Sequence, residues 1–205
     1  MKTVIVTAFE PFGDDALNPT EKILAQTPSF LFNAKVVKVT LPVIYKEAFD
    51  QLKPLIDKHN PEAIILLGLA GGRTHISIER IAMNMNHSDA PDNQGNILKH
   101  HKIIPDGEDG LFTTYPLEKL MERIHQAELP VVISNTAGGY ICNDIMYRTL
   151  HYIKTQKLKT VAGFIHVPYI PTQVLTKNQP SMALKPMIDT VLLLINELVN
   201  PIEPA

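Results

Sequence analysis

The sequence predicts an α/β fold built on a mixed, largely parallel sheet. Short apolar runs alternate with amphipathic segments along the chain, which is typical of this fold class. Several of the runs are apolar throughout, as expected for strands that are covered on both faces. The run that begins at residue 76 follows the one that ends at residue 68 too closely for a helical crossover, so the sheet is expected to be mixed.

The predicted strands all combine a short apolar run with flanking turn formers. They are residues 3–9, 34–43, 62–68, 76–85, 129–135 and 160–167.

The predicted helices lie between these strands, and two of them carry clear signals. The stretch "NPTE" at 18–21 offers Asn18 as a cap, proline in the first turn and a glutamate three residues after the cap,. In "YPLEKLMERIHQA" the apolar residues of 117–124 form one stripe,. The predicted helices are 19–27, 44–59, 116–128, 141–156 and 181–198.

Two segments do not fit the alternation. Residues 86–115 are rich in turn formers and too long for a plain connection,. Residues 168–180 carry three prolines directly after a strand. Both segments are candidates for functional loops, and a surface or subunit contact explains them as well.

Length and composition indicate one soluble domain, residues 1–205,. A formal net charge of −2 gives no broad attraction to nucleic acid or to an anionic membrane,. The single cysteine cannot form an internal disulfide, and "MKTVIVTAF" is too short and too poorly flanked for a signal peptide,. A cytoplasmic location is therefore expected.

The only cysteine, Cys142, lies in "TAGGYICNDIMYRTL". A strand, a glycine turn and a helix succeed one another here, so Cys142 falls in the first turn of the helix. Unpaired N–H groups and the helix dipole at that position favour a thiolate and could stabilise an oxyanion. The alternative is a small buried thiol without a chemical role.

One of the eight histidines, His166, ends the apolar run "TVAGFIHV". The crevice of an α/β sheet usually lies at the carboxyl ends of its strands, and Cys142 is expected at the same edge. His166 is thus a candidate base, although a core histidine bonded to the backbone is an equal alternative.

An acid, Glu79, stands in the otherwise apolar strand predicted for 76–85. A buried carboxylate needs a partner. Arg73 or Arg80 could serve structurally, and a histidine could serve catalytically, as in other triads. Spacing alone does not choose among them.

Together these stretches resemble the pyroglutamyl peptidase I family of cysteine enzymes, the pyrrolidone carboxyl peptidases, almost from end to end. The matching motifs are "FEPFG" with "NPT", "LPV" at 41–43, "GLAGGRTHISIERIAMN" at 68–84, "PDNQGN" at 91–96, "SNTAGGYICN" at 134–143 and "GFIHVPYIPTQ" at 163–173. Each motif is a modest signal, and their order and spacing together are highly specific.

The resemblance implies a catalytic triad of Glu79, Cys142 and His166, the residues already singled out. It also implies a single α/β/α sandwich, a homotetramer, and removal of N-terminal 5-oxoproline from peptides without a metal or cofactor. No stretch has the spacing of a zinc site,.

Pyroglutamate is a neutral lactam, so its pocket needs apolar walls and a few hydrogen-bonding groups. The resemblance implies that Phe9 and Phe12 sandwich the ring. Tyr140 and Ile141 are expected in neighbouring wall positions. Asn18 is expected as a polar contact, although its role as a helix cap would explain it equally well.

The sequence departs from the family pattern at three places. Residues 89–93 read "DAPDN" where many relatives have "DARIPDN", so the loop at 86–95 is shorter and lacks an arginine. Asp14 replaces the second glycine of "FGG". Leu69 replaces a frequent glutamine, so a lactam contact there would have to come from the backbone.

Two other functions are compatible with the same fold. One is a silent or regulatory pyroglutamyl-binding protein, which the shortened loop would favour and the retained triad disfavours. The other is a different acyl hydrolase or a phosphorylase, but only Arg73 and Arg80 are near the motifs to bind phosphate. No basic stripe indicates nucleic-acid binding.

Overall fold

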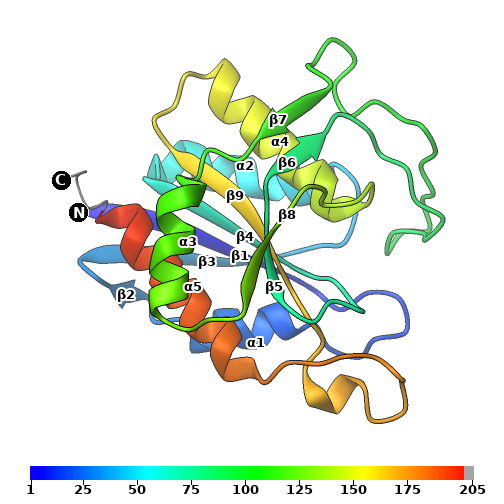
Figure 1. Ribbon diagram of the computed structural model, residues 1–205. Helices are drawn as coiled ribbons and strands as arrows, with labels where there is room; N and C mark the ends of the chain where they lie inside the picture. The colour runs from blue at the N-terminus through cyan, green and yellow to red at the C-terminus, as the bar shows by residue number, and fades with distance from the viewer. Residues whose placement is uncertain (201–205) are drawn as a thin grey trace.

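A computed structural model describes residues 1–200 of the chain; the last five residues of the predicted 1–205 domain lie outside the described residues. Within residues 1–200, the chain forms a seven-stranded sheet in the order β2-β3-β1-β4-β9-β5-β8 (Figure 1). The strands are β1 (Lys2–Phe9), β2 (Phe30–Leu31), β3 (Ala34–Leu41), β4 (Ala63–Leu69), β5 (Ile76–Glu79), β8 (Val131–Ser134) and β9 (Val161–Val167).

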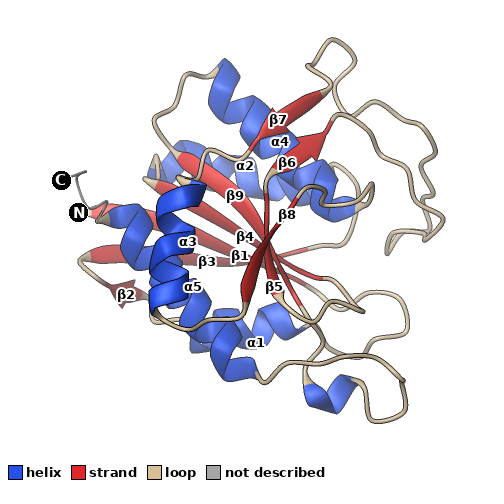
Figure 2. Ribbon diagram, in the orientation of Figure 1, coloured by secondary structure: helices blue, strands red, loops and turns tan. Residues whose placement is uncertain are grey.

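Helices cover both faces of this sheet (Figure 2). One apolar cluster joins a sheet face to α1 (Pro19–Gln26), α3 (Leu117–Gln126) and α5 (Leu184–Val199). A second cluster joins the opposite face to α2 (Glu47–His59) and α4 (Ile141–Thr155). This arrangement confirms the three-layer α/β/α sandwich. Within residues 1–200, none of the helices combines the length and the apolar character that crossing a membrane requires.

The sheet is mixed, as the sequence predicts. Strands β3, β1, β4 and β9 run parallel. Strand β5 runs antiparallel to β9, and β8 runs parallel to β5. The central strands β1 and β4 are almost wholly buried, which agrees with their uninterrupted apolar sequences,.

The prediction of one strand over residues 76–85 is wrong. The chain leaves the main sheet after Glu79 and continues as β6 (Ile81–Met83), which pairs with β7 (Gly110–Phe112) in a small second sheet. The amide of Met83 donates to the Asn143 side chain of α4 at 2.8 Å. Asn143 is 60 residues away in the sequence, so the local pattern of residues 76–85 could not indicate this hydrogen bond.

The sequence does not predict the direction of the strand before Cys142, which the structure gives. Because β8 is antiparallel to β9, its carboxyl end lies beside Glu79 and Phe164, not beside the carboxyl end of β9. The segment 135–140 then carries the chain to the start of α4. Short elements without a sequence signal were missed: β2, β7 and the 3-10 helix Pro171–Gln173.

Candidate active site

A small, mostly apolar cavity ends at the only cysteine. Its lining consists of Phe9, Phe12, Asn18, Val43, Leu69, Tyr140, Ile141 and Cys142. The structure therefore brings together all six residues that were predicted to contact substrate, and it adds Val43. The cavity is small and its lining is mostly apolar, which suits a single uncharged ring.

Local backbone geometry presents Cys142 to this cavity. Helix α4 begins at Ile141, so Cys142 occupies its second position. The preceding turn needs glycine twice. Gly138 has a φ of 81°, a left-handed conformation that only glycine adopts readily. At Gly139, a Cβ would lie 2.5 Å from the carbonyl oxygen of His87.

A third glycine, Gly68 in β4, makes room for the thiol. A Cβ on Gly68 would lie 3.0 Å from Cys142 Sγ and 2.6 Å from the Phe164 ring. Gly68 is the partner of His166 in the parallel β4–β9 register. Paired residues of neighbouring strands point to the same face of a sheet, so Cys142 Sγ and the His166 side chain lie over the same patch of β4 and β9.

The histidine and the predicted acid are in direct contact. His166 Nδ1 lies 2.7 Å from Glu79 Oε1, and both side chains are buried, with relative exposures of 5% and 0%. Glu79 ends β5 and is paired with Phe164, two residues before His166 on β9. Glu79, Phe164 and His166 thus face the same layer as α4.

The structure also settles which arginine binds Glu79. Arg73, in the segment between β4 and β5, donates from Nη1 to Glu79 Oε1 at 2.7 Å. Its Nη2 reaches the carbonyl oxygen of Thr136 at 3.5 Å. Arg80 is exposed, and its backbone N–H donates to Ser134 at 2.7 Å. The sequence left the choice of partner open, and the fold supplies both Arg73 and His166.

Burial and charge act in opposite directions on the acid–histidine pair. Burial alone would raise the pKa of Glu79, but the hydrogen bond and charge of His166, with the charge of Arg73, bring it below its ordinary value. Burial lowers the pKa of His166 and outweighs the opposite effect of Glu79,. These directions favour an ionised Glu79 and a neutral His166, in which case Nδ1–H of the imidazole donates to the carboxylate.

Burial raises the pKa of the Cys142 thiol to about 12, and the negative charge of Glu79 adds to this effect. Arg73 and the backbone N–H of Cys142 act in the opposite direction. This direction favours a neutral thiol in the free protein, against the thiolate that the helix start by itself would favour,. Ionisation of the thiol needs transfer of its proton to a base.

Aromatic rings form one wall of the cavity. Tyr140 lies between Phe12, at a centroid distance of 6.2 Å, and Tyr45, at 5.7 Å in an edge-to-face arrangement. The Tyr140 hydroxyl donates to the carbonyl oxygen of Pro91 at 2.8 Å. The shortened loop is thereby in direct contact with the pocket wall.

Asn18 has the structural role of a helix cap. It is 1% exposed, and its Oδ1 accepts hydrogen bonds from the amide and the hydroxyl of Thr20, at 3.1 and 2.7 Å. Its Nδ2 donates to the carbonyl of Glu10 at 3.2 Å. One N–H of the amide has no protein partner among residues 1–200, so the capping role leaves a donor available to the cavity.

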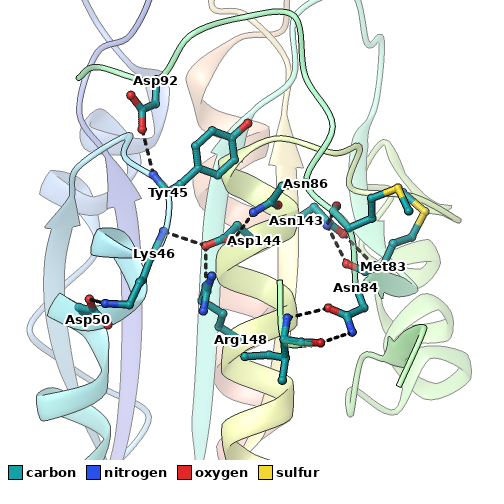
Figure 3. Close-up of polar contacts among 12 residues, drawn as sticks. Tyr45, Lys46, Asp50, Met83, Asn84, Asn86, Asp92, Asn143, Asp144 and Arg148 are labelled. Atoms are coloured by element: carbon teal, nitrogen blue, oxygen red, sulfur yellow. Dashed lines mark hydrogen bonds and ion pairs between the residues drawn. The ribbon is translucent and has the colours of Figure 1, made fainter. Parts of the chain in front are cut away.

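The two residues after Cys142 anchor its helix, and sequence reasoning missed both. Asn143 Nδ2 donates to the carbonyls of Met83 and Met85. Asp144 is fully buried and accepts from Asn86 Nδ2 at 2.7 Å, from the Lys46 amide at 3.1 Å and from Arg148 Nε at 2.9 Å (Figure 3). The burial of Asp144 and its partners depend on distant segments, so no local pattern indicated them.

A buried carboxylate also organises the shortened loop. Asp92 accepts from the amides of Tyr45, Gln94 and Asn96, and these bonds help to lower its pKa against the effect of burial. Asn93 donates to the Glu10 side chain at 2.8 Å. The loop is thus tied to the segment after β1 although it lacks the arginine of many relatives.

Comparison with known proteins agrees with this geometry. The pyroglutamyl peptidase family model matches residues 2–200. The chain is 46% identical over 187 residues to a pyrrolidone-carboxylate peptidase of Oceanobacillus iheyensis, covering 90% of this chain and 93% of that protein. It is 38% identical over 198 residues to the Thermosipho africanus pyrrolidone-carboxylate peptidase, with coverages of 96% and 97%.

Solved structures give the same result. Pyrrolidone carboxyl peptidase from Thermococcus litoralis has a TM-score of 0.93 at 37% identity, covering 98% of this chain and 94% of that chain. Pyroglutamyl peptidase I from Bacillus amyloliquefaciens has a TM-score of 0.92 at 33% identity, with coverages of 100% and 99%. On the strength of the family model, the relatives and the shared fold, this chain belongs to the pyroglutamyl peptidase family.

Proposed function

We propose that this protein is a cysteine peptidase that hydrolyses the amide bond after an N-terminal pyroglutamyl residue, with Glu79, Cys142 and His166 as its triad. The observation that carries the proposal is the small apolar cavity that ends at Cys142. The Glu79–His166 pair lies beside the cysteine on the same face of the sheet.

The cavity suits a lactam better than an ordinary peptide amino terminus. No acidic side chain is among its lining residues within 1–200, so a buried ammonium group would lack a counter-charge there. A pyroglutamyl ring carries no such charge. Its apolar edge would pack against Phe9 and Phe12, and the spare N–H of Asn18 is placed to donate to an oxygen.

The first half of the reaction forms an acyl-enzyme. His166 accepts the Cys142 proton at Nε2 as the sulfur attacks the pyroglutamyl carbonyl carbon. The N–H groups at the start of α4, including that of Cys142, stabilise the oxyanion. The imidazolium then gives its proton to the leaving nitrogen, the amide bond breaks, and a thioester remains. Glu79 holds the ring and stabilises its transient positive charge.

The second half consumes one water. His166 removes a proton from this water as its oxygen attacks the thioester carbon. The carbon–sulfur bond then breaks, Cys142 recovers its proton, and free pyroglutamate leaves. No group other than water and these side chains is needed for the balance.

Hydrolysis of a fluorogenic pyroglutamyl anilide tests the proposal, with the prolyl analogue as the matched substrate that lacks the lactam carbonyl. We expect selective cleavage of the pyroglutamyl compound and its abolition by iodoacetamide. Cys142→Ser is expected to lower kcat/KM by at least about 10⁴-fold. His125→Gln on the exposed side of α3 serves as a control that keeps full activity.

Each failure has a distinct meaning. Equal cleavage of both substrates would refute the lactam pocket. Full activity of Cys142→Ser would refute the nucleophile. No cleavage by folded, reduced protein would instead identify a silent pyroglutamyl-binding member of the family.

We further propose a cytoplasmic location, one catalytic domain over residues 1–205, and a homotetramer. The unpaired cysteine supports a reducing compartment,, and the family match over residues 2–200 supports a single domain. Exposed Phe112 and Leu175 are apolar surface of the kind that subunit contacts bury. Light scattering of the purified protein tests the oligomeric state.

A further inference from the structure

Arg73 lies against the triad but has no part in the reaction steps above. Its Nη1 and His166 Nδ1 are each 2.7 Å from the same atom, Glu79 Oε1. The other carboxylate oxygen, Oε2, is buried without a hydrogen-bond partner among the described residues. A cation and an imidazole thus share one oxygen of a carboxylate that has no contact with solvent.

We propose that Arg73 is a positioning residue of the triad that compensates the charge of Glu79, so that His166 rests as a neutral base with its proton on Nδ1. This inference rests on the proposed function, because it concerns the base of that reaction.

The argument follows from counting charges in a buried site. Without Arg73, Glu79 would be a lone buried anion, and the nearest way to neutralise it would be to protonate His166. A protonated His166 could not accept the Cys142 proton. With Arg73 in place, the carboxylate already has a counter-charge, and His166 needs to supply only a hydrogen bond.

The same cation also balances the reacting state. Once the proton moves from Cys142 to His166, the site holds a thiolate, an imidazolium, the Glu79 carboxylate and the Arg73 guanidinium, with no net charge. Without Arg73 the thiolate would form beside an uncompensated carboxylate. Tyr140 is a further titratable neighbour of the thiol, and the charge of a thiolate would raise its pKa.

The position of Arg73 suits this role. Its side chain is 28% exposed, so a guanidinium can reach Glu79 while keeping part of its hydration. Its second nitrogen contacts Thr136, in the segment that leads to Cys142. A purely structural role, holding that segment, is therefore the alternative that an experiment has to exclude.

The pH dependence of kcat/KM for the pyroglutamyl anilide separates the two roles. In Arg73→Met, the acid limb of the kcat/KM profile is expected to move upward by about one pH unit. Within this limb kcat/KM should then fall by about tenfold, and at the plateau it should fall less. Arg73→Lys, which keeps the charge, should restore the wild-type limb. Arg80→Met is the matched control, since the exposed Arg80 side chain has no hydrogen bond or ion pair with Glu79 among the described residues.

A loss of activity in Arg73→Met that is the same at every pH, with an unmoved limb, would overturn the proposal in favour of a structural role. A second measurement needs no Arg73 variant and no turnover. In ¹⁵N-labelled wild-type protein at pH 7, the His166 signal, assigned by its absence in His166→Gln, should show a neutral ring protonated at Nδ1. An imidazolium there would overturn the proposal even if the peptidase activity is confirmed, and a neutral ring would support it even if that activity is absent.

Discussion

Gly68 and Cys142 meet over the face of β4 that is covered by α2 and α4. Because Gly68 has no side chain, the sulfur of Cys142 can approach β4 closely. A Cβ on Gly68 would lie only 3.0 Å from Sγ. Phe164 closes the same space from β9 at 2.6 Å. The placement of the nucleophile therefore depends on a residue without a side chain, 74 positions earlier in the sequence.

Gly68→Ala should consequently impair activity more than stability. The new methyl group must displace the Phe164 ring or Cys142, and a displacement of about 1 Å at a reacting atom costs about 10²-fold in rate. Overpacking is expected to lower the free energy of unfolding by about 1–3 kcal/mol. Steady-state kinetics and urea unfolding measure the two effects.

Gly110→Ala is the control for this prediction. Gly110 lies in the small β6–β7 sheet. A Cβ there would lie 3.0 Å from the end of the flexible Ile81 side chain and would not meet Cys142. We expect wild-type kinetics for this variant. An unchanged kcat/KM in Gly68→Ala would contradict the prediction. It would show that the added methyl group fits without displacing Cys142.

At the scale of elements, the amino-terminal end of helix α4 is held by polar side chains as well as by the core contacts of Ile141 and Ile145. Asn143 and Asp144 connect it to the segment after β6 and to the start of α2 (Figure 3). Arg148, one turn further along, is largely buried beside Asp144. These bonds fix the turn of the helix that carries Cys142.

Asp144→Asn is expected to lower the free energy of unfolding by about 3 kcal/mol, because it leaves the Arg148 cation without its partner in a buried site. The new amide would also turn a donor toward the N–H groups of Asn86 or Lys46. Asp50→Asn breaks the exposed Lys46–Asp50 pair and should cost less than about 1 kcal/mol. Urea unfolding of both variants tests this; equal costs would mean that the Asp144 bonds add nothing beyond a surface pair.

Across the whole molecule, the buried site links stability to pH. The folded-state pKa of His166 lies below its ordinary value near 6.5. Between these two values the unfolded chain binds the extra proton, so the free energy of unfolding falls as pH falls below about 6.5. The pKa values of Glu79 and Asp92 are also lowered. These two carboxylates stabilise the folded state at pH values above the carboxyl pKa of the unfolded chain. This stabilisation is lost as the pH falls through their lower pKa values in the folded chain.

Urea unfolding at pH 7 and pH 5 should therefore show a loss of stability that is smaller in His166→Gln than in the wild type. His125→Gln serves as the control, because that side chain is exposed on α3. A His166→Gln variant with the full wild-type loss would mean that His166 is already charged in the folded protein.

Much of this molecule could be predicted from local patterns. The central strands and the main helices follow from periodicity, and the Asn18 cap is found where "NPTE" places it. The six residues that the family resemblance implied as substrate contacts line one cavity, together with Val43, which was not predicted. Three features had no local signal: the break after Glu79, the direction of β8, and the bonds of Asn143 and Asp144.

The sequence by itself determined the chemistry available to this protein: one thiol, one histidine at a strand end, one acid in an apolar run, and a family-specific order of motifs. Tertiary structure decided how those groups act. It brought Arg73, not Arg80, to Glu79, and it partly buried Cys142, which raises the pKa of its thiol. Burial and through-space charge depend on segments far apart in the chain, and spacing along the sequence carries no measure of either.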